Sequence, residues 1–105
     1  MYGYTIHIPA PIEVYHAMHE AVLAVVDEEG GAEGLVVHLA YPTDDGFDLT
    51  EVWESREGLD AFNHDVFPKA MARAGMPMDG PQPQPIEFTP AAVMTPRAFT
   101  SSAAG

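Results

Sequence analysis

The order in which the hydrophobic period changes along the chain restricts the fold more than any other feature of this sequence. Alternation of apolar and polar residues is typical of a strand, whereas apolar residues spaced three and four apart indicate a helix. The sequence switches between these two patterns several times. The expected elements, in order, are strand 2–8, helix 12–28, strand 35–41, strand 47–54, helix 56–74 and strand 86–95.

Single residues set the limits of these elements. The segment PAP at 9–11 ends the first strand, because proline donates no hydrogen bond to a sheet. Ser55 is a suitable N-cap for the second helix. Pro68 lies inside that helix and removes the backbone bond to the carbonyl of His64, so we expect a kink or a restart there.

This order of elements predicts an α+β, ferredoxin-like fold, with a four-stranded antiparallel sheet and two helices on one face. The strand at 35–41 is apolar on both sides. Its two faces carry Leu35, Val37, Leu39 and Tyr41 on one side, and Val36, His38 and Ala40 on the other. Both sides therefore need a cover, and a second copy of the chain in a two-fold homodimer is the simplest cover for the side without helices.

Length and charge limit the classes of function. The 105 residues suffice for one domain, which we place at 1–95, followed by a flexible tail at 96–105. The formal charge of -12 disfavours nucleic acid and anionic membranes as partners. Without a signal-peptide pattern or a run of roughly 20 apolar residues, the chain is expected to be soluble and cytoplasmic. The absence of cysteine excludes disulfides and thiolate chemistry.

The segment Glu51-x-Trp53 followed by Ser55, together with His64-x-x-x-Pro68 in the next helix, resembles the dimeric α/β-barrel superfamily. Within it, the sequence is most similar to the antibiotic-biosynthesis-monooxygenase-like branch, over about residues 3–95. The resemblance implies that two sheets pack into a barrel across a homodimer, and that a pocket opens between each sheet and its own helices. Members include cofactor-independent quinone-forming oxygenases, haem-degrading oxygenases and relatives of polyketide cyclases.

Two positions depart from the pattern of that family. Its helix histidine usually lies nine residues after the tryptophan, where this chain has Phe62, and His64 reaches that position only after a two-residue shift. The first strand reads Thr5, Ile6 and His7, without the asparagine of the haem-degrading and oxygenase members. The resemblance therefore predicts the fold better than it predicts the activity.

Three residues are candidates for catalysis by proton transfer. His64, at the margin of the apolar face of the second helix, is suited to act as a base near neutral pH or to ligate iron. His19 lies on the apolar side of the first helix, where burial would lower its pKa, and burial of Glu51 would raise the pKa of that carboxyl. A structural role stays open for each: a cap on free helix carbonyls for His64, a bond to a tyrosine or carbonyl for His19, and a bond to a backbone amide or an arginine for Glu51.

A second group of residues is expected to bind the ligand, because aromatic walls suit a small hydrophobic or aromatic molecule. These residues are Tyr4, His38, Trp53, Phe62 and Phe67. Trp53 is equally suited to the core, and His38 would line the dimer barrel if its strand face met the partner. No spacing of the five histidines is a metal signature, so no metal is expected.

The leading hypothesis is a cofactor-independent enzyme, monooxygenase-like or cyclase/isomerase-like, that acts on a small hydrophobic aromatic or polyketide-like molecule. His64 or His19 would be its proton-transfer group. The alternative is a non-catalytic homodimeric module for small-molecule binding or assembly. A third hypothesis is a haem-binding or haem-degrading relative that uses His64, which the missing asparagine and the acidic charge disfavour.

Overall fold

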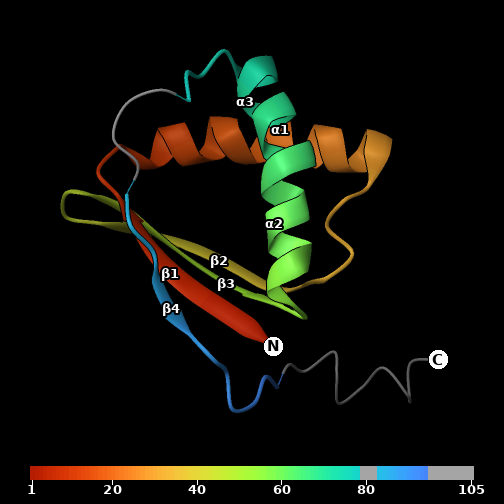
Figure 1. Ribbon diagram of the computed structural model, residues 1–105. Helices are drawn as coiled ribbons and strands as arrows, with labels where there is room; N and C mark the ends of the chain where they lie inside the picture. Colours follow the sequence, from red (N-terminus) through yellow and green to blue (C-terminus); the bar gives the residue numbers. More distant parts are fainter. Residues whose placement is uncertain (79–82, 95–105) are drawn as a thin grey trace, which may run out of the picture.

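The computed structural model describes residues 1–78 and 83–94 and confirms the α+β, ferredoxin-like arrangement (Figure 1). Its sheet has four strands in the order β2-β3-β1-β4, and every neighbouring pair is antiparallel. The elements are β1 (Tyr2–Ile8), α1 (Ile12–Glu29), β2 (Leu35–Thr43), β3 (Gly46–Trp53), α2 (Arg56–Asp65), α3 (Phe67–Ala74) and β4 (Ile86–Phe88). The expected tail at 96–105 lies outside the described residues, so it stays a prediction.

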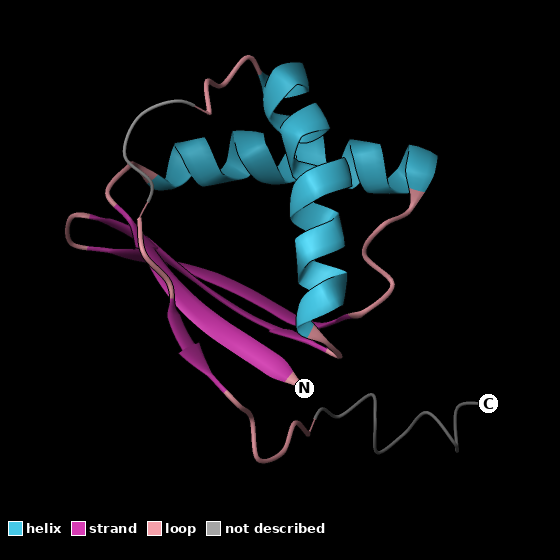
Figure 2. Ribbon diagram, viewed as in Figure 1, coloured by secondary structure: helices cyan, strands magenta, loops and turns pink. Residues whose placement is uncertain are grey.

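All three helices lie on one side of the sheet, and α3 packs on α1 (Figure 2). The restart expected at Pro68 is confirmed, because α2 ends at Asp65 and α3 begins with Pro68 in its first turn. The N-cap is confirmed as well: the Ser55 hydroxyl accepts a hydrogen bond of 3.2 Å from the backbone N–H of Gly58. In the described part of the chain, no helix is both long and apolar enough to cross a membrane.

A bulge in β2 corrects one expectation about the faces of that strand. Leu35 pairs with Trp53 and Val37 pairs with Val52, so one extra residue lies between the two pairs. The extra residue turns Leu35 to the face opposite Val37, whereas simple alternation placed both on the same face. Leu35 therefore shares the helix-facing side with His38, and His38 does not face outward toward a partner.

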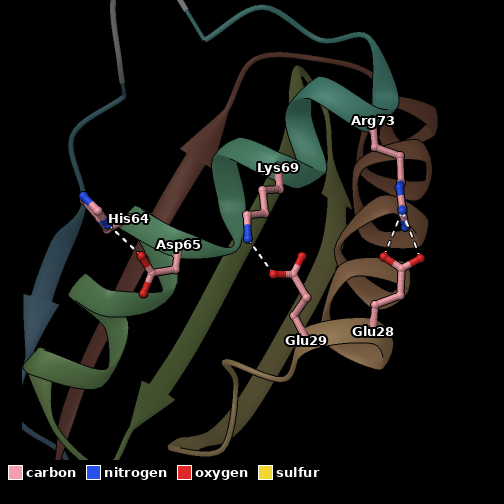
Figure 3. A network of polar contacts seen from close by, with 6 residues as sticks. All are labelled: Glu28, Glu29, His64, Asp65, Lys69 and Arg73. Atoms are coloured by element: carbon pink, nitrogen blue, oxygen red, sulfur yellow. Dashed lines mark hydrogen bonds and ion pairs between the residues drawn. The ribbon is translucent and has the colours of Figure 1, made fainter.

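The core is divided into two clusters of buried side chains. One joins α1 to the α2–α3 segment through Ala21, Val25, Val66, Ala70 and Met71. The other packs the first half of α1 on the sheet through Tyr15, Phe47 and Leu49. Two exposed ion pairs, Lys69 with Glu29 at 2.5 Å and Arg73 with Glu28 at 2.9 Å, connect α3 to the last turn of α1 (Figure 3).

The outer face of the sheet, away from the helices, carries exposed apolar side chains. In β2 these are Leu39, which is 51% exposed, and Tyr41, at 43%. Ile86 and Phe88 of β4 pair with Thr5 and Gly3 of β1 and add to the same face. β4 is an edge strand, as expected, but it is only three residues long, because Pro85 precedes it and Pro90 follows it closely.

Candidate functional site

A cavity of about 690 Å³ lies between the helices and the helix-facing side of the sheet. This volume suits a small organic ligand. The walls are mainly apolar and include Tyr15 and Leu49 of the second core cluster and partly buried side chains that pack against the first, such as Val22 and Phe62. Aromatic wall residues come from five elements and are Tyr2, Tyr4, Tyr15, Trp53, Phe62 and Phe67.

Glu51 is the one buried charged residue in the described part of the chain, with 7% of its surface exposed. Its carboxylate is held from three directions. Oε1 accepts a 2.7 Å hydrogen bond from the hydroxyl of Tyr4 and a 2.9 Å bond from Nε1 of Trp53, and Oε2 lies 2.5 Å from Nδ1 of His38. The pairing of β3 with β1 and β2 makes this possible, because Tyr4 and His38 both lie directly opposite Glu51.

The expectation that Glu51 has a raised pKa is wrong. Burial does raise the pKa, but the hydrogen bonds from His38, Trp53 and Tyr4 together outweigh it and leave the pKa below the ordinary value. The interior position of Glu51 was predicted correctly from the sequence, but its three hydrogen-bond donors were not. The carboxylate is therefore ionised at neutral pH.

His38 links this carboxylate to Tyr15 of α1. Nδ1 faces Glu51, and Nε2 lies 2.7 Å from the Tyr15 hydroxyl. A carboxylate accepts hydrogen bonds only, so Nδ1 carries a proton, and Nε2 of the neutral ring accepts from the Tyr15 O–H. Glu51, His38 and Tyr15 thus form a continuous chain for proton movement that ends in the cavity.

His19 stacks against the end of this chain. Its ring is nearly parallel to those of Tyr15 and His38, with ring centres 5.2 and 5.4 Å away. Desolvation lowers the pKa of His19, and the neighbouring His38 and His16 lower it further, as the sequence led us to expect. Within the described residues neither ring nitrogen of His19 makes a hydrogen bond, so a neutral imidazole is available to a ligand in the cavity.

The two cavity tyrosines of the hydrogen-bond network remain protonated near neutral pH. Burial, followed by the charge of Glu51, raises the pKa of both Tyr4 and Tyr15. Each phenol is therefore a hydrogen-bond donor: Tyr4 donates to Glu51, and Tyr15 donates to His38.

The structure brings seven of the eight sequence candidates to the cavity. These are Tyr4, His19, His38, Glu51, Trp53, Phe62 and Phe67. Trp53 also belongs to the core, since it is 1% exposed and its ring contacts that of Phe62 with 5.4 Å between centroids. Both readings of Trp53, core residue and cavity wall, therefore describe its position.

His64 does not line this cavity, contrary to the expected pocket. Its side chain is 87% exposed and bonds Asp65 at 2.7 Å on the outside of the helix (Figure 3). The reason is helical geometry: His64 follows the cavity residue Phe62 by two positions, about 200° around the helix. The haem hypothesis depended on His64, so this position gives it no support.

Tyr15 is a residue of the site that sequence reasoning did not single out. A signal was present, because Tyr15 and His19 are four residues apart and therefore neighbours on one helix face. No group of three or more histidine, aspartate or glutamate residues is placed to hold a metal ion within residues 1–78 and 83–94.

No protein-family model and no curated protein matches this sequence. Solved structures do match the fold. The "putative Antibiotic biosynthesis monooxygenase" of Chloroflexus aurantiacus J-10-fl aligns with a TM-score of 0.58 and 19% identity, over 90% of this chain and 96% of that one. Rv0793 from Mycobacterium tuberculosis aligns with a TM-score of 0.54 and 15% identity, over 90% and 98%.

A conserved protein from Methanosarcina mazei Go1 aligns with a TM-score of 0.54 and 13% identity, over 83% of this chain and 89% of that one. At these identities the likeness establishes the fold alone. The chain has the ferredoxin-like fold that is also found in the structure from Chloroflexus aurantiacus.

Proposed function

We propose that this protein is an acid–base enzyme that removes a proton from a hydroxylated, mainly hydrophobic aromatic molecule. The observation that carries the proposal is the Glu51–His38–Tyr15 chain, which ends inside an apolar cavity of about 690 Å³. A carboxylate that fixes an imidazole, with the second imidazole nitrogen directed at a reacting hydroxyl, is a recurrent arrangement for activating O–H groups.

The proton moves along groups that this chain supplies. A substrate hydroxyl donates to the oxygen of Tyr15 while the Tyr15 proton passes to Nε2 of His38. The substrate becomes an oxyanion, Tyr15 is again a phenol, and His38 becomes an imidazolium. Glu51, 2.5 Å from Nδ1, stabilises the positive charge on that ring without becoming protonated itself.

His19 completes the acid–base arrangement by staying neutral. The two stacked imidazoles are 5.4 Å apart, so a proton on His38 disfavours a second one on His19. The free nitrogen of His19 is then a hydrogen-bond partner for the substrate. We assign His38 as the proton acceptor, Tyr15 as the relay, and Glu51 as a positioning residue that acts through His38.

The cavity walls set the class of substrate. Rings of Trp53, Phe62 and Phe67 favour a flat aromatic molecule by stacking and by displacing water. The electron-rich anion that results is the common first species for a monooxygenase-like and for a cyclase- or isomerase-like reaction. Oxygen uptake separates these two outcomes, since only the monooxygenase-like reaction consumes it.

The test is turnover of a panel of hydroxylated aromatics by wild type, His38→Gln and His64→Gln. Loss of a general base lowers the rate by about 10²–10⁴-fold, so we expect this loss in His38→Gln. His64→Gln is the matched control, because its side chain is exposed outside the cavity and should keep the wild-type rate. Equal rates in all three proteins would overturn the assignment.

The alternative of a non-catalytic homodimeric module has one observation in its favour. The outer face of the sheet exposes Leu39, Tyr41, Ile86 and Phe88, which a second copy of the chain would cover. We propose the homodimer on this ground, for the enzyme and for the binding module alike. Tight binding of panel compounds without any turnover would favour the module.

A further inference from the structure

Arg56 is the one arginine or lysine among the described residues that line the cavity. The whole sequence contains four lysine and arginine residues against sixteen acidic ones. Lys69 and Arg73 connect α3 to α1 on the outside, and Arg97 lies outside the described residues. In a chain so poor in positive charge, a guanidinium at the cavity requires an explanation of its own.

Arg56 is oriented by two contacts at the edge of the cavity. Its NH1 lies 2.8 Å from Oε2 of Glu87 in β4, and its guanidinium carbon lies 5.3 Å from the centre of the Tyr2 ring. Glu87 is opposite Tyr4 in the sheet, so its carboxylate is on the helix-facing side. The structure thus already holds one carboxylate on Arg56 at the edge of a mainly apolar cavity.

The contact with Glu87 is open to exchange. The two side chains are 60% and 45% exposed, and exposed ion pairs contribute little to stability. β4 consists of three exposed residues at the edge of the sheet. Glu87 contacts one guanidinium nitrogen, whereas a free carboxylate can approach the planar fork with both oxygens, which is the stronger arrangement.

Arg56 and the free end of the acid–base chain line the same cavity from different elements. Arg56 lies over Tyr2 of β1, whereas Tyr15 belongs to α1 and joins the chain through His38. A ligand that extends across the cavity can therefore contact Arg56 with one end and Tyr15 with the other.

Building on the proposed function, we propose that the substrate is a hydroxylated aromatic carboxylic acid. Arg56 binds its carboxylate in place of Glu87, and the hydroxyl at the opposite end meets Tyr15 and His19. Glu87 then acts as an internal competitor that occupies Arg56 in the free protein. The remaining negative charge of the chain repels anions elsewhere, so recognition of the acid depends on this one arginine.

The experiment compares acids with their uncharged amides. The pairs are para-hydroxybenzoate, para-hydroxyphenylacetate and para-hydroxycinnamate, each with its amide, titrated by calorimetry at fixed ionic strength. The proteins are wild type, Arg56→Gln, Arg56→Lys, Glu87→Gln and, as a control outside the cavity, Lys69→Gln. A one-dimensional proton spectrum of each variant verifies that it is folded.

We expect wild type to bind at least one acid about tenfold or more tightly than its amide, as for a charge-assisted contact. Arg56→Gln should remove this preference while the amide binds as before, and Arg56→Lys should retain part of it. Glu87→Gln should strengthen binding of the acid several-fold without changing that of the amide. Lys69→Gln should behave as wild type.

Equal binding of acid and amide by wild type, or a preference that survives in Arg56→Gln, would overturn the role of Arg56. That outcome leaves the proposed function standing, because the amide still occupies the cavity and His38→Gln still tests the proton transfer. A complete absence of binding by acids, amides and neutral hydroxylated aromatics would instead count against the proposed function itself.

Discussion

The two faces of the sheet differ in a way that stability alone does not explain. The helix-facing side buries an ionised carboxylate, Glu51, among hydrogen-bond donors. The outer face exposes large apolar side chains, among them Leu39 and Ile86. A monomer selected only for stability would carry the opposite pattern, with apolar residues inside and charges outside.

The buried carboxylate and the exposed apolar side chains are each unfavourable for the stability or solubility of a monomer, and a function would explain their presence. Desolvation of a carboxylate is unfavourable, and three donors must offset it before the network stabilises anything. Exposed apolar area favours association with another surface. We therefore relate the inner departure to proton transfer in the cavity and the outer one to pairing of two chains.

Trp53→Ala should have the largest effect on stability, because Trp53 stabilises the helix-facing side of the sheet in two ways. The ring is 1% exposed and its N–H donates to Glu51. Removing a buried tryptophan side chain costs about 3–5 kcal/mol of unfolding free energy. Chemical denaturation, followed by circular dichroism, measures the loss.

Trp53→Phe is the control for this prediction, because it retains an aromatic ring while it removes the N–H donor and part of the ring volume. Loss of one hydrogen bond to a charged group costs about 1.5–3 kcal/mol, so this variant should keep more stability than Trp53→Ala. A small loss in Trp53→Ala, together with loss of ligand binding, would show that Trp53 serves the cavity and not the core.

Glu51→Leu should have the second-largest effect on stability. It leaves the donors of Tyr4, Trp53 and His38 without their acceptor, at a cost of about 1–3 kcal/mol for each group that stays buried and unpaired. Glu51→Gln should lose less, because its carbonyl oxygen still accepts from Tyr4 and Trp53. Its NH₂ group must donate to Nδ1 of His38, which moves the proton of that ring to Nε2.

This tautomer change gives Glu51 a readout that a purely structural role would not affect. In Glu51→Gln the ring nitrogen shifts of His38 should exchange, and turnover should fall, because a protonated Nε2 no longer accepts from Tyr15. The pKa of Glu51 in the folded protein is lowered, so its charge stabilises the fold at higher pH and this contribution is lost as the pH falls through the lowered pKa. The stability difference between Glu51→Gln and wild type should therefore shrink in acid.

How much the sequence revealed differs between the fold and the site. Period and proline positions were enough for the order of elements, the restart at Pro68 and the edge position of β4. The bulge at Val36 changes which side chains point inward, and nothing in the local sequence marks it. Tyr15 was missed as part of the site because a tyrosine on an apolar helix face resembles an ordinary core residue, and its spacing to His19 was the one signal that set it apart.

The site was also harder to predict because its members are distant in sequence. Tyr4, Tyr15, His38 and Glu51 lie on four different elements, and strand register together with the packing of α1 on the sheet brings them together. The family-like spacing to Pro68 favoured His64, but helical rotation places that side chain outside. Alignment of a motif therefore gave less information here than the direction of each side chain.

Leu39→Glu tests the proposed role of the outer face, and its expected effect, on homodimer affinity, is intermediate in size. A charge in the middle of the exposed apolar face should weaken a homodimer by about tenfold or more, which light scattering across micromolar concentrations would detect. Ala17→Glu adds the same charge to an exposed position of α1 and is the control. A wild-type protein that is monomeric throughout this range would contradict the proposed role of the outer face.

The smallest expected effect is on the pH dependence of stability, and it should have opposite signs for a histidine on each face of the sheet. Desolvation, with the neighbouring His38 and His16, lowers the pKa of His19, so the fold disfavours the protonated ring. The hydrogen bond to Asp48, aided by the charge of Asp45, raises the pKa of His7 on the outer face, so the fold favours protonation there. By linkage, acidification below about pH 6.5 removes stability through His19, whereas the stability contributed by His7 is present below that pH and is lost as the pH rises through the raised pKa.

Thermal unfolding of His19→Gln and His7→Gln at about pH 5.5 and 7.5 separates the two contributions. Relative to wild type, His19→Gln should lose less stability on acidification, because the group that resists protonation is gone. His7→Gln should lose more, because the group that gains from protonation is gone, and the effect should be modest since His7 is exposed. If both variants changed the pH dependence of stability in the same direction, the proposed contrast between His19 and His7 would be wrong. The fold would then not disfavour protonation on one face of the sheet and favour it on the other.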